Sequence, residues 1–192
     1  MKINFDGGDL SSDAGLLLIK EFSAKIGFSK LIKKKFKTND KTVRFHKDDE
    51  NLMQMIYQVI SAYFEDDCAD ELTLDSVFNA ILKKDRLTSQ PTLSRFFNRM
   101  DEGTLLQFDD IDKSLRDIIY SIKYPEHMLL NLDSTLFGIY GNQEGEGFNF
   151  HYQAHGYHLL LCYDGLIGDL LKAELCDGTL HCSNDSDKCE LP

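Results

Sequence analysis

Asp133 is the carboxylate of this sequence that is best placed to do chemistry. It ends a short apolar run, residues 128–133, and is followed by Ser134 and Thr135. The run has the length of a strand, and a carboxylate at the end of a rigid strand is well placed to hold a divalent metal ion. The other interpretation is a surface aspartate that caps the next turn, and position alone leaves both open.

Three histidines form a second pattern that metal sites use. The spacing of His151, His155 and His158 would suit zinc on a helix. However, their segment mixes glycine with aromatic residues, which is typical of the approach to a strand. Histidines at i and i+4 on a strand lie about 13 Å apart, too far for one tetrahedral zinc ion. We therefore do not expect zinc here.

The chain is acidic overall and basic in one segment. Its 192 residues carry a formal net charge of −11, yet residues 20–47 hold ten basic and two acidic side chains. The overall charge argues against a protein that coats nucleic acid over its whole surface. A local basic patch on an acidic protein can still contact phosphates.

Two predicted helices, residues 72–84 and 91–100, have the proportions of a helix-turn-helix pair. In the second helix the apolar residues pack inward, so that Thr92, Arg95 and Arg99 share the outer face. From there they can read base edges or hold phosphates. An ordinary helical hairpin with a solvated polar face explains the same pattern equally well.

Composition limits the remaining classes of protein. Hydrophobic residues make up 42% of the chain, enough for a folded core. No apolar run reaches the roughly 20 residues of a membrane helix, and the first residues lack the layout of a signal peptide, so we expect no membrane partner. Five cysteines without a C-x-x-C pair favour a reducing compartment. The sequence therefore predicts a cytoplasmic protein.

The hydrophobic period changes from helical to strand-like near residue 125. Before it, helical patterns dominate, including a buried central helix over residues 50–64. After it, three strands are predicted over residues 128–133, 157–163 and 169–175. We thus predict an α+β chain with a mainly helical region, residues 1–125. Residues 126–192 form an incomplete strand-containing unit with an irregular tail.

Several segments together resemble the DDE group 1 transposases of bacterial insertion sequences. The resemblance spans about residues 3–175 and is carried by LSSDAG at 10–15, SQPTLSR at 89–95, LNLDST at 130–135, YGNQEG at 140–145, NFHYQAHGYH at 149–158 and LCYDGLIGDLLKAEL at 161–175. Their order and number, rather than any one motif, carry the resemblance.

The resemblance implies an RNase H-like catalytic domain whose carboxylates bind two Mg²⁺ ions. These ions activate water, and then a DNA 3′-hydroxyl, for attack on phosphodiesters. Asp133 matches the first acid of the Asp-Asp-Glu set and would be a catalytic residue and a metal ligand. The second aspartate and the glutamate have no match before residue 192. We therefore expect the first three strands of a truncated RNase H-like fold, inactive alone.

The resemblance also implies double-stranded DNA, at the transposon ends, as the partner. The residues expected to contact it are Lys33, Lys34, Lys35 and Lys37, as phosphate contacts, and Arg95 and Arg99, for sequence preference. A homo-oligomer is a further expectation. The alternative function is a non-catalytic DNA-binding or inhibitory fragment, which competes for transposon ends or multimerises with intact transposase.

Overall fold

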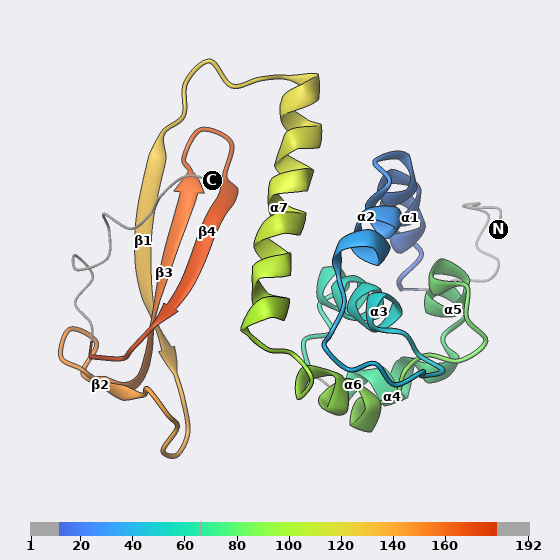
Figure 1. Cartoon of the computed structure of the whole chain (residues 1–192), viewed down its shortest axis with the longest axis horizontal. Helices are drawn as coiled ribbons and strands as arrows, with labels where there is room; N and C mark the ends of the chain where they lie inside the picture. Colours follow the sequence, from blue (N-terminus) through green and yellow to red (C-terminus); the bar gives the residue numbers. More distant parts are fainter. Residues whose placement is uncertain (1–11, 66, 180–192) are drawn as a thin grey trace. The chain divides into compact units, whose positions relative to one another are not determined.

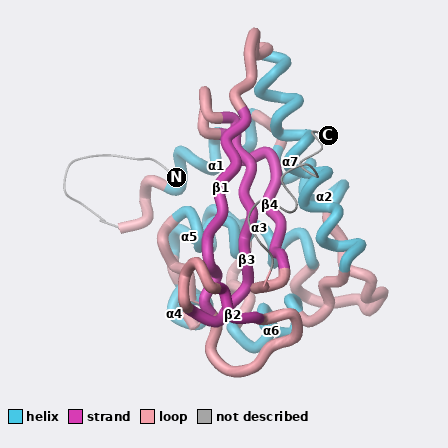
Figure 2. Tube along the Cα trace, turned by 90° about the vertical axis from the view of Figure 1, so that its left-hand side faces the viewer, coloured by secondary structure: helices cyan, strands magenta, loops and turns pink. Residues whose placement is uncertain are grey.

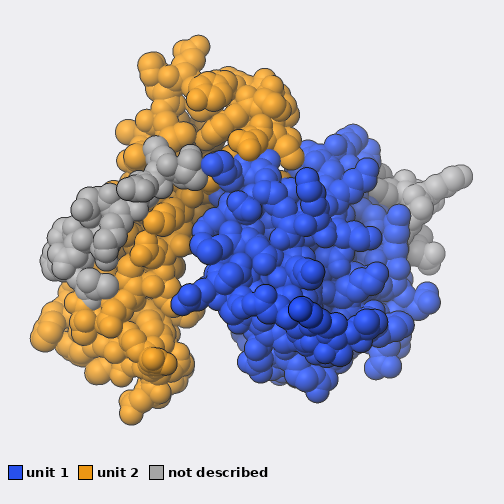
Figure 3. Space-filling view, in the orientation of Figure 1, with its two compact units in different colours: residues 1–114 blue, residues 115–192 orange. Residues whose placement is uncertain are grey.

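The computed structural model describes residues 12–65 and 67–179. The chain divides into two compact units, unit 1 (residues 1–114) and unit 2 (residues 115–192), which Figure 3 shows in two colours. Unit 1 is helical and unit 2 is built on an antiparallel sheet, so the α+β prediction is confirmed. The first residues of the LSSDAG segment and most of the predicted tail lie outside the described residues.

Loops connect the helices of unit 1, the longest between α2 and α3, and the last helix continues into unit 2 (Figure 1). None of the helices within the described ranges is long and apolar enough to cross a membrane. The helices are α1 (Leu16–Lys25), α2 (Phe28–Lys35), α3 (Asp48–Ile60), α4 (Cys68–Glu71), the 3-10 helix η1 (Leu72–Leu74), α5 (Ser76–Leu82), α6 (Gln90–Phe97) and α7 (Glu102–Ile122).

α3 is the buried helix that the sequence predicted over residues 50–64. Its first turn carries three acids, which interact favourably with the positive end of the helix dipole: Asp48, Asp49 and Glu50. The helix ends at Ile60 because Ala62 adopts a left-handed backbone conformation with φ of 65°. The predicted helix is therefore too long at its end.

The helix predicted over residues 72–84 is broken at Asp75. This residue has an extended backbone, and its carboxylate accepts hydrogen bonds from the backbone N–H groups of Val77 and Phe78. It therefore caps α5 and separates it from η1. α6 begins where the Ser-Gln-Pro segment predicted, with Ser89 as its N-cap residue. The helix-turn-helix interpretation of α5 and α6 stays a prediction.

A buried side-chain clamp sets the start of α6. The Gln54 Oε1 atom of α3 accepts from the Thr88 backbone N–H at 2.8 Å, and Gln54 Nε2 donates to the Thr88 carbonyl oxygen at 2.9 Å. The Thr88 hydroxyl donates to Asn51 Oδ1 at 2.8 Å. Gln54 and Thr88 are fully buried. Because Ser89 follows directly, the clamp fixes where α6 begins relative to α3.

Aromatic packing completes the core around the end of α2. The ring of Phe36 lies 5.9 Å from that of Phe96 in α6 and 5.3 Å from that of Phe108 in α7. Phe36 and Phe96 are buried. Large aromatic side chains dominate the energetics of such cores, so this contact holds the end of α2 against both helices.

Unit 2 contains a sheet with β3 (Ala154–Asp164) at its centre, visible in Figure 2 with β1 and β4 beside it. β1 (Leu130–Gly138) pairs along one edge of β3, whereas β2 (Gly147–Asn149) and β4 (Asp169–Cys176) pair along the other. All pairings are antiparallel. The three predicted strands are present, and β2 is a strand that the sequence did not predict.

The prediction that Asp133 ends its strand is wrong. β1 continues to Gly138, and Asp133 pairs with Leu161 in the middle of the ladder. The strand can continue because β3 offers it a partner for its whole length. Near its end the two backbones approach closely, and a Cβ atom at Gly156 would collide with the Phe137 carbonyl oxygen.

The last turns of α7 belong to unit 2. The Arg116 guanidinium is buried and donates to the carbonyl oxygens of Leu170 and Leu171 in β4, at 3.3 and 3.4 Å. This contact connects the second half of α7 to β4. The division between the two compact units lies inside α7, between Ser114 and Leu115.

A second glutamine clamp allows a matched test of the first. Gln107 accepts from the Lys37 N–H at 2.7 Å and donates to the Lys37 carbonyl oxygen at 3.0 Å, in an exposed setting. Gln54→Leu should lower the free energy of unfolding by about 2–4 kcal/mol, because it leaves two buried backbone groups without partners. Gln107→Leu should cost less than about 1 kcal/mol, because water can take over both of its hydrogen bonds.

Urea unfolding followed by far-UV circular dichroism measures both variants. Equal destabilisation for the buried and the exposed clamp would contradict this account of α6.

Candidate DNA-binding surface and metal ligand

α2 carries the lysines predicted to contact phosphates. Lys33 and Lys34 of the helix are exposed, and so is Lys37, which follows it. Lys35 is different, because its amino group lies 3.7 Å from the Asp110 carboxylate and donates to the Asp110 carbonyl oxygen at 3.1 Å. Three of the four lysines thus face water, and the fourth holds α2 against α7 within unit 1.

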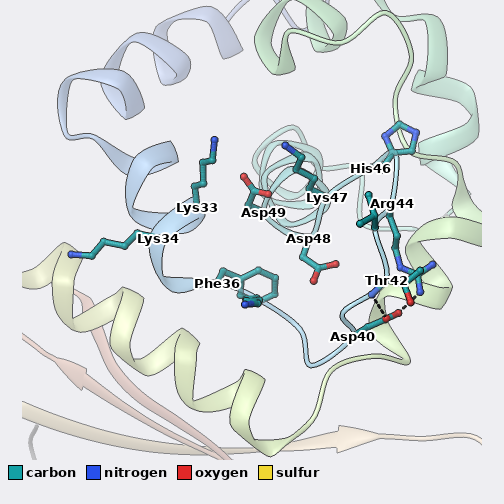
Figure 4. Close-up of a pocket in the computed structure, with 12 residues that line it drawn as sticks. Lys33, Lys34, Phe36, Asp40, Thr42, Arg44, His46, Lys47, Asp48 and Asp49 are labelled. Atoms are coloured by element: carbon teal, nitrogen blue, oxygen red, sulfur yellow. Dashed lines mark hydrogen bonds and ion pairs between the residues drawn. The ribbon is translucent and has the colours of Figure 1, made fainter.

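The loop after α2, residues 39–47, folds over a hollow of about 380 Å³ (Figure 4). Its shape depends on Asp40, which accepts from the Thr42 N–H at 2.8 Å and pairs with Arg44. Hydrogen bonds from Thr42 and Arg44 hold the pKa of the Asp40 carboxyl well below its usual range. The same carboxylate lies 3.9 Å from Arg99 Nε. The 39–47 loop is therefore attached to the region that follows α6.

Asp48, at the start of α3, joins three segments of unit 1. Its carboxylate accepts from the Thr38 N–H at 3.0 Å, from the Thr38 hydroxyl at 2.6 Å and from Arg99 Nη2 at 3.0 Å. Burial alone would raise the pKa of Asp48, but the hydrogen bonds from Thr38 and Arg99 outweigh it and lower the pKa. The charged carboxylate therefore stabilises the fold.

Arg95 and Arg99 of the predicted DNA-reading face have different surroundings. Arg95 is exposed, and its guanidinium donates to the Thr92 hydroxyl at 3.3 Å. The Arg99 side chain is only 11% exposed, pairs with Asp48, and lies over the Phe96 ring at 5.5 Å. Arg95 can reach a ligand, whereas the guanidinium of Arg99 is already engaged inside unit 1.

A second hollow, of about 420 Å³, is lined by lysines of α1 and α2 and by the two lysines that follow α5. Lys83 and Lys84 follow α5 and line it with Lys20 and Lys30. Lys84 pairs with Glu50 at 2.8 Å, and Lys20 donates to the carbonyl oxygens at the end of α5. Lys83 and Lys84 were not among the predicted site residues, although they form a lysine pair at the end of the helix predicted over residues 72–84.

Asp133 lies apart from Asp164 and Asp169, two other acids of unit 2. Its side chain is exposed and accepts from the Ser134 N–H at 2.9 Å. Asp133 pairs with Leu161 of β3, so both side chains lie on the same face of the sheet. Side chains alternate between the two faces along a strand, and Asp164 is three residues beyond Leu161. The buried Asp164 and its ladder partner Asp169 therefore occupy the opposite face. These carboxylates cannot converge on one ion with Asp133.

Comparison with protein families matches residues 1–191 to the family described as Transposase DDE domain group 1. The chain belongs to this family. No curated protein matches the chain, and no solved structure matches it. The resemblance found in the sequence is therefore confirmed.

DDE transposases use divalent metal, so the residues of this chain can be tested as ligands for it. Mg²⁺ prefers near-octahedral coordination by oxygen atoms. Over residues 12–65 and 67–179, no cluster of three or more His, Cys, Asp or Glu side chains could hold a metal ion. One exposed carboxylate, Asp133, does not make a magnesium site. The described residues by themselves do not complete a magnesium site.

The depressed pKa of Asp48 makes unit 1 sensitive to acid. Because the folded pKa lies below the unfolded value of about 3.9, the stabilisation is complete above that value and is lost as pH falls through the folded pKa. Asp48→Asn should lower the free energy of unfolding by about 1–3 kcal/mol near pH 7, and the difference from the unaltered chain should vanish in strong acid.

Asp49→Asn, one residue along the same first turn, is the matched control and should cost less than about 1 kcal/mol. Urea titrations at several pH values measure both. A difference for Asp48→Asn that persists unchanged in strong acid would contradict the proposed role of its charge.

Proposed function

We propose that this chain is the DNA-engaging part of a DDE transposase, and that unit 1 binds double-stranded DNA at transposon ends. The observation that carries the proposal is the arrangement of charge on unit 1. Lys33, Lys34 and Lys37 face water, whereas Asp40 and Asp48 bind partners within the protein. A rigid surface with outward cations suits the DNA backbone.

α6 is proposed to give the DNA binding its preference for certain base sequences. Arg95 is the exposed cation of this helix, and Arg residues commonly make bidentate contacts to guanine. Arg99 remains a predicted DNA contact, but its ion pair with Asp48 favours a positioning role, in which it holds the 39–47 loop and the end of α6 together.

Unit 2 is proposed to form the first strands of an RNase H-like domain. The support is that β1, β3 and β4 lie side by side as antiparallel strands and are built from the segments that resemble DDE transposases. In that interpretation Asp133 is the first catalytic carboxylate and a Mg²⁺ ligand. We propose a cytoplasmic location, because transposases act on cellular DNA and the cysteine pattern favours a reducing compartment.

A non-catalytic role for this chain alone is the second candidate. It is favoured by the separation of Asp133 from the other described acids. Such a chain occupies transposon ends or multimerises with intact transposase. The exposed apolar side chains of unit 2 support the multimer: Phe137, Leu166, Leu170 and Leu175 are each at least 39% exposed.

DNA binding and its salt dependence test the proposed function. Replacing Lys33, Lys34 and Lys37 together by Gln should lower the slope of log affinity against log salt by about 0.9 for each phosphate that is no longer neutralised. Replacing Lys113, Lys123 and Lys172 by Gln removes the same charge elsewhere and should leave the slope unchanged.

Fluorescence anisotropy with a labelled random-sequence duplex gives these slopes. Equal falls in slope for the two triple variants would mean that net charge, not the α2 surface, attracts DNA. Absence of binding by the unaltered chain would contradict the proposal.

The second candidate predicts that the purified chain binds duplex DNA but does not cut it when Mg²⁺ is added. The physical reason is that a single carboxylate cannot hold two metal ions. A nicking assay on supercoiled plasmid carrying transposon ends measures this, with Asp133→Ala as the control. Mg²⁺-dependent nicking that Asp133→Ala abolishes would contradict the non-catalytic role.

A further inference from the structure

Two apolar side chains of the 39–47 loop stand in water. Val43 is 97% exposed and Phe45 is 88% exposed. Single exposed hydrophobic residues are ordinary, but these two alternate with cations, because Lys41, Arg44 and Lys47 flank and separate them. No described part of unit 1 covers either of the two side chains.

The loop that presents them is held in place by specific contacts. Asp40 fixes its first turn through Thr42 and Arg44. At its end, the His46 ring packs edge-on against Phe45 with 4.8 Å between ring centroids. His46 Nδ1 in turn lies 3.0 Å from Lys84 Nζ. Phe45 is therefore exposed on a supported loop, which reduces the ordering cost of binding through it.

We propose that Phe45 stacks on a base of the bound DNA, with Val43 beside it as a second apolar contact. Lys41 and Lys47 of the same loop hold the flanking phosphates, while Arg44 stays paired with Asp40. Every base offers a π-face to an aromatic ring, and apolar side chains can enter a base step when neighbouring cations hold the backbone. This inference rests on the proposed function and names the contact through which unit 1 engages DNA.

Charge complementarity distinguishes this loop from other exposed aromatic residues. Phe64 is 73% exposed, but it is followed by acids that repel phosphate, among them Glu65 and Asp67. Phe45 belongs to the most basic segment of the chain. The two residues share a side chain and a high exposure and differ in the sign of the surrounding charge, so Phe64 is a matched control.

A fluorescent side chain at position 45 detects stacking directly, because the chain contains no tryptophan. Duplex DNA should quench the emission of the Phe45→Trp variant and leave that of Phe64→Trp unchanged. Two duplexes are compared, one fully paired and one with a single unpaired base. Quenching by the paired duplex indicates entry into the base stack. Quenching only by the other duplex indicates stacking on an unpaired base, and both results support the proposal.

Affinity provides the second readout. Phe45→Ala should weaken binding by roughly 5- to 150-fold, the range found when a stacking aromatic residue is removed. The salt slope should not change, because phenylalanine displaces no counterions. Phe45→Trp should retain the affinity. Phe64→Ala should bind as the unaltered chain does.

Three results would overturn the inference. They are unchanged affinity for Phe45→Ala, equal quenching of both tryptophan variants, and binding without quenching of Phe45→Trp. In each of these cases DNA still binds, so the proposed function stands while the stacking contact fails. If the unaltered chain binds neither duplex, both the proposed function and the inference fail.

Discussion

The hydrogen-bonded ion pair between Asp48 and Arg99 is the interaction on which the arrangement of unit 1 depends. One carboxylate receives Thr38 from the segment after α2 and Arg99 from the segment after α6, and it belongs to the first turn of α3 itself. Removal of one member of such a partly buried pair leaves the other charge without compensation. The free energy lost in this way is far larger than the net stabilisation that the intact pair provides. The basic segment, the buried helix and α6 are therefore positioned together.

The same interaction explains how an acidic protein presents a basic surface. The carboxylates of Asp40, Asp48 and Asp110 are used to bind the loop, Arg99 and Lys35. Their negative charge is neutralised locally, so the exposed lysines of α2 and the cations of the 39–47 loop dominate the potential beside them. Exposed cations alone would give non-specific attraction. A fixed loop and a fixed α6 add the geometry that selective contacts need.

Local signals predicted much of this fold. The Ser89 cap and Pro91 marked the start of α6, and the change of period marked the transition to strands. Local signals were not enough where a distant partner decides the outcome. Asp133 lies within β1 rather than at its end, because β3 pairs with the strand beyond it. Arg99 points into unit 1 because it pairs with Asp48, which is distant in sequence. The hydrophobic periodicity of the sequence does not reveal this pair.

Hydrogen–deuterium exchange of the full chain, with and without duplex DNA, tests the central claim most directly. The claim is that unit 1 binds DNA through one surface, formed by the end of α2, the 39–47 loop and α6. DNA should slow amide exchange over residues 33–47 and 90–97 and leave β3 and β4 unchanged. Slowed exchange confined to the strands of unit 2, with no effect on α2 and α6, would contradict the account.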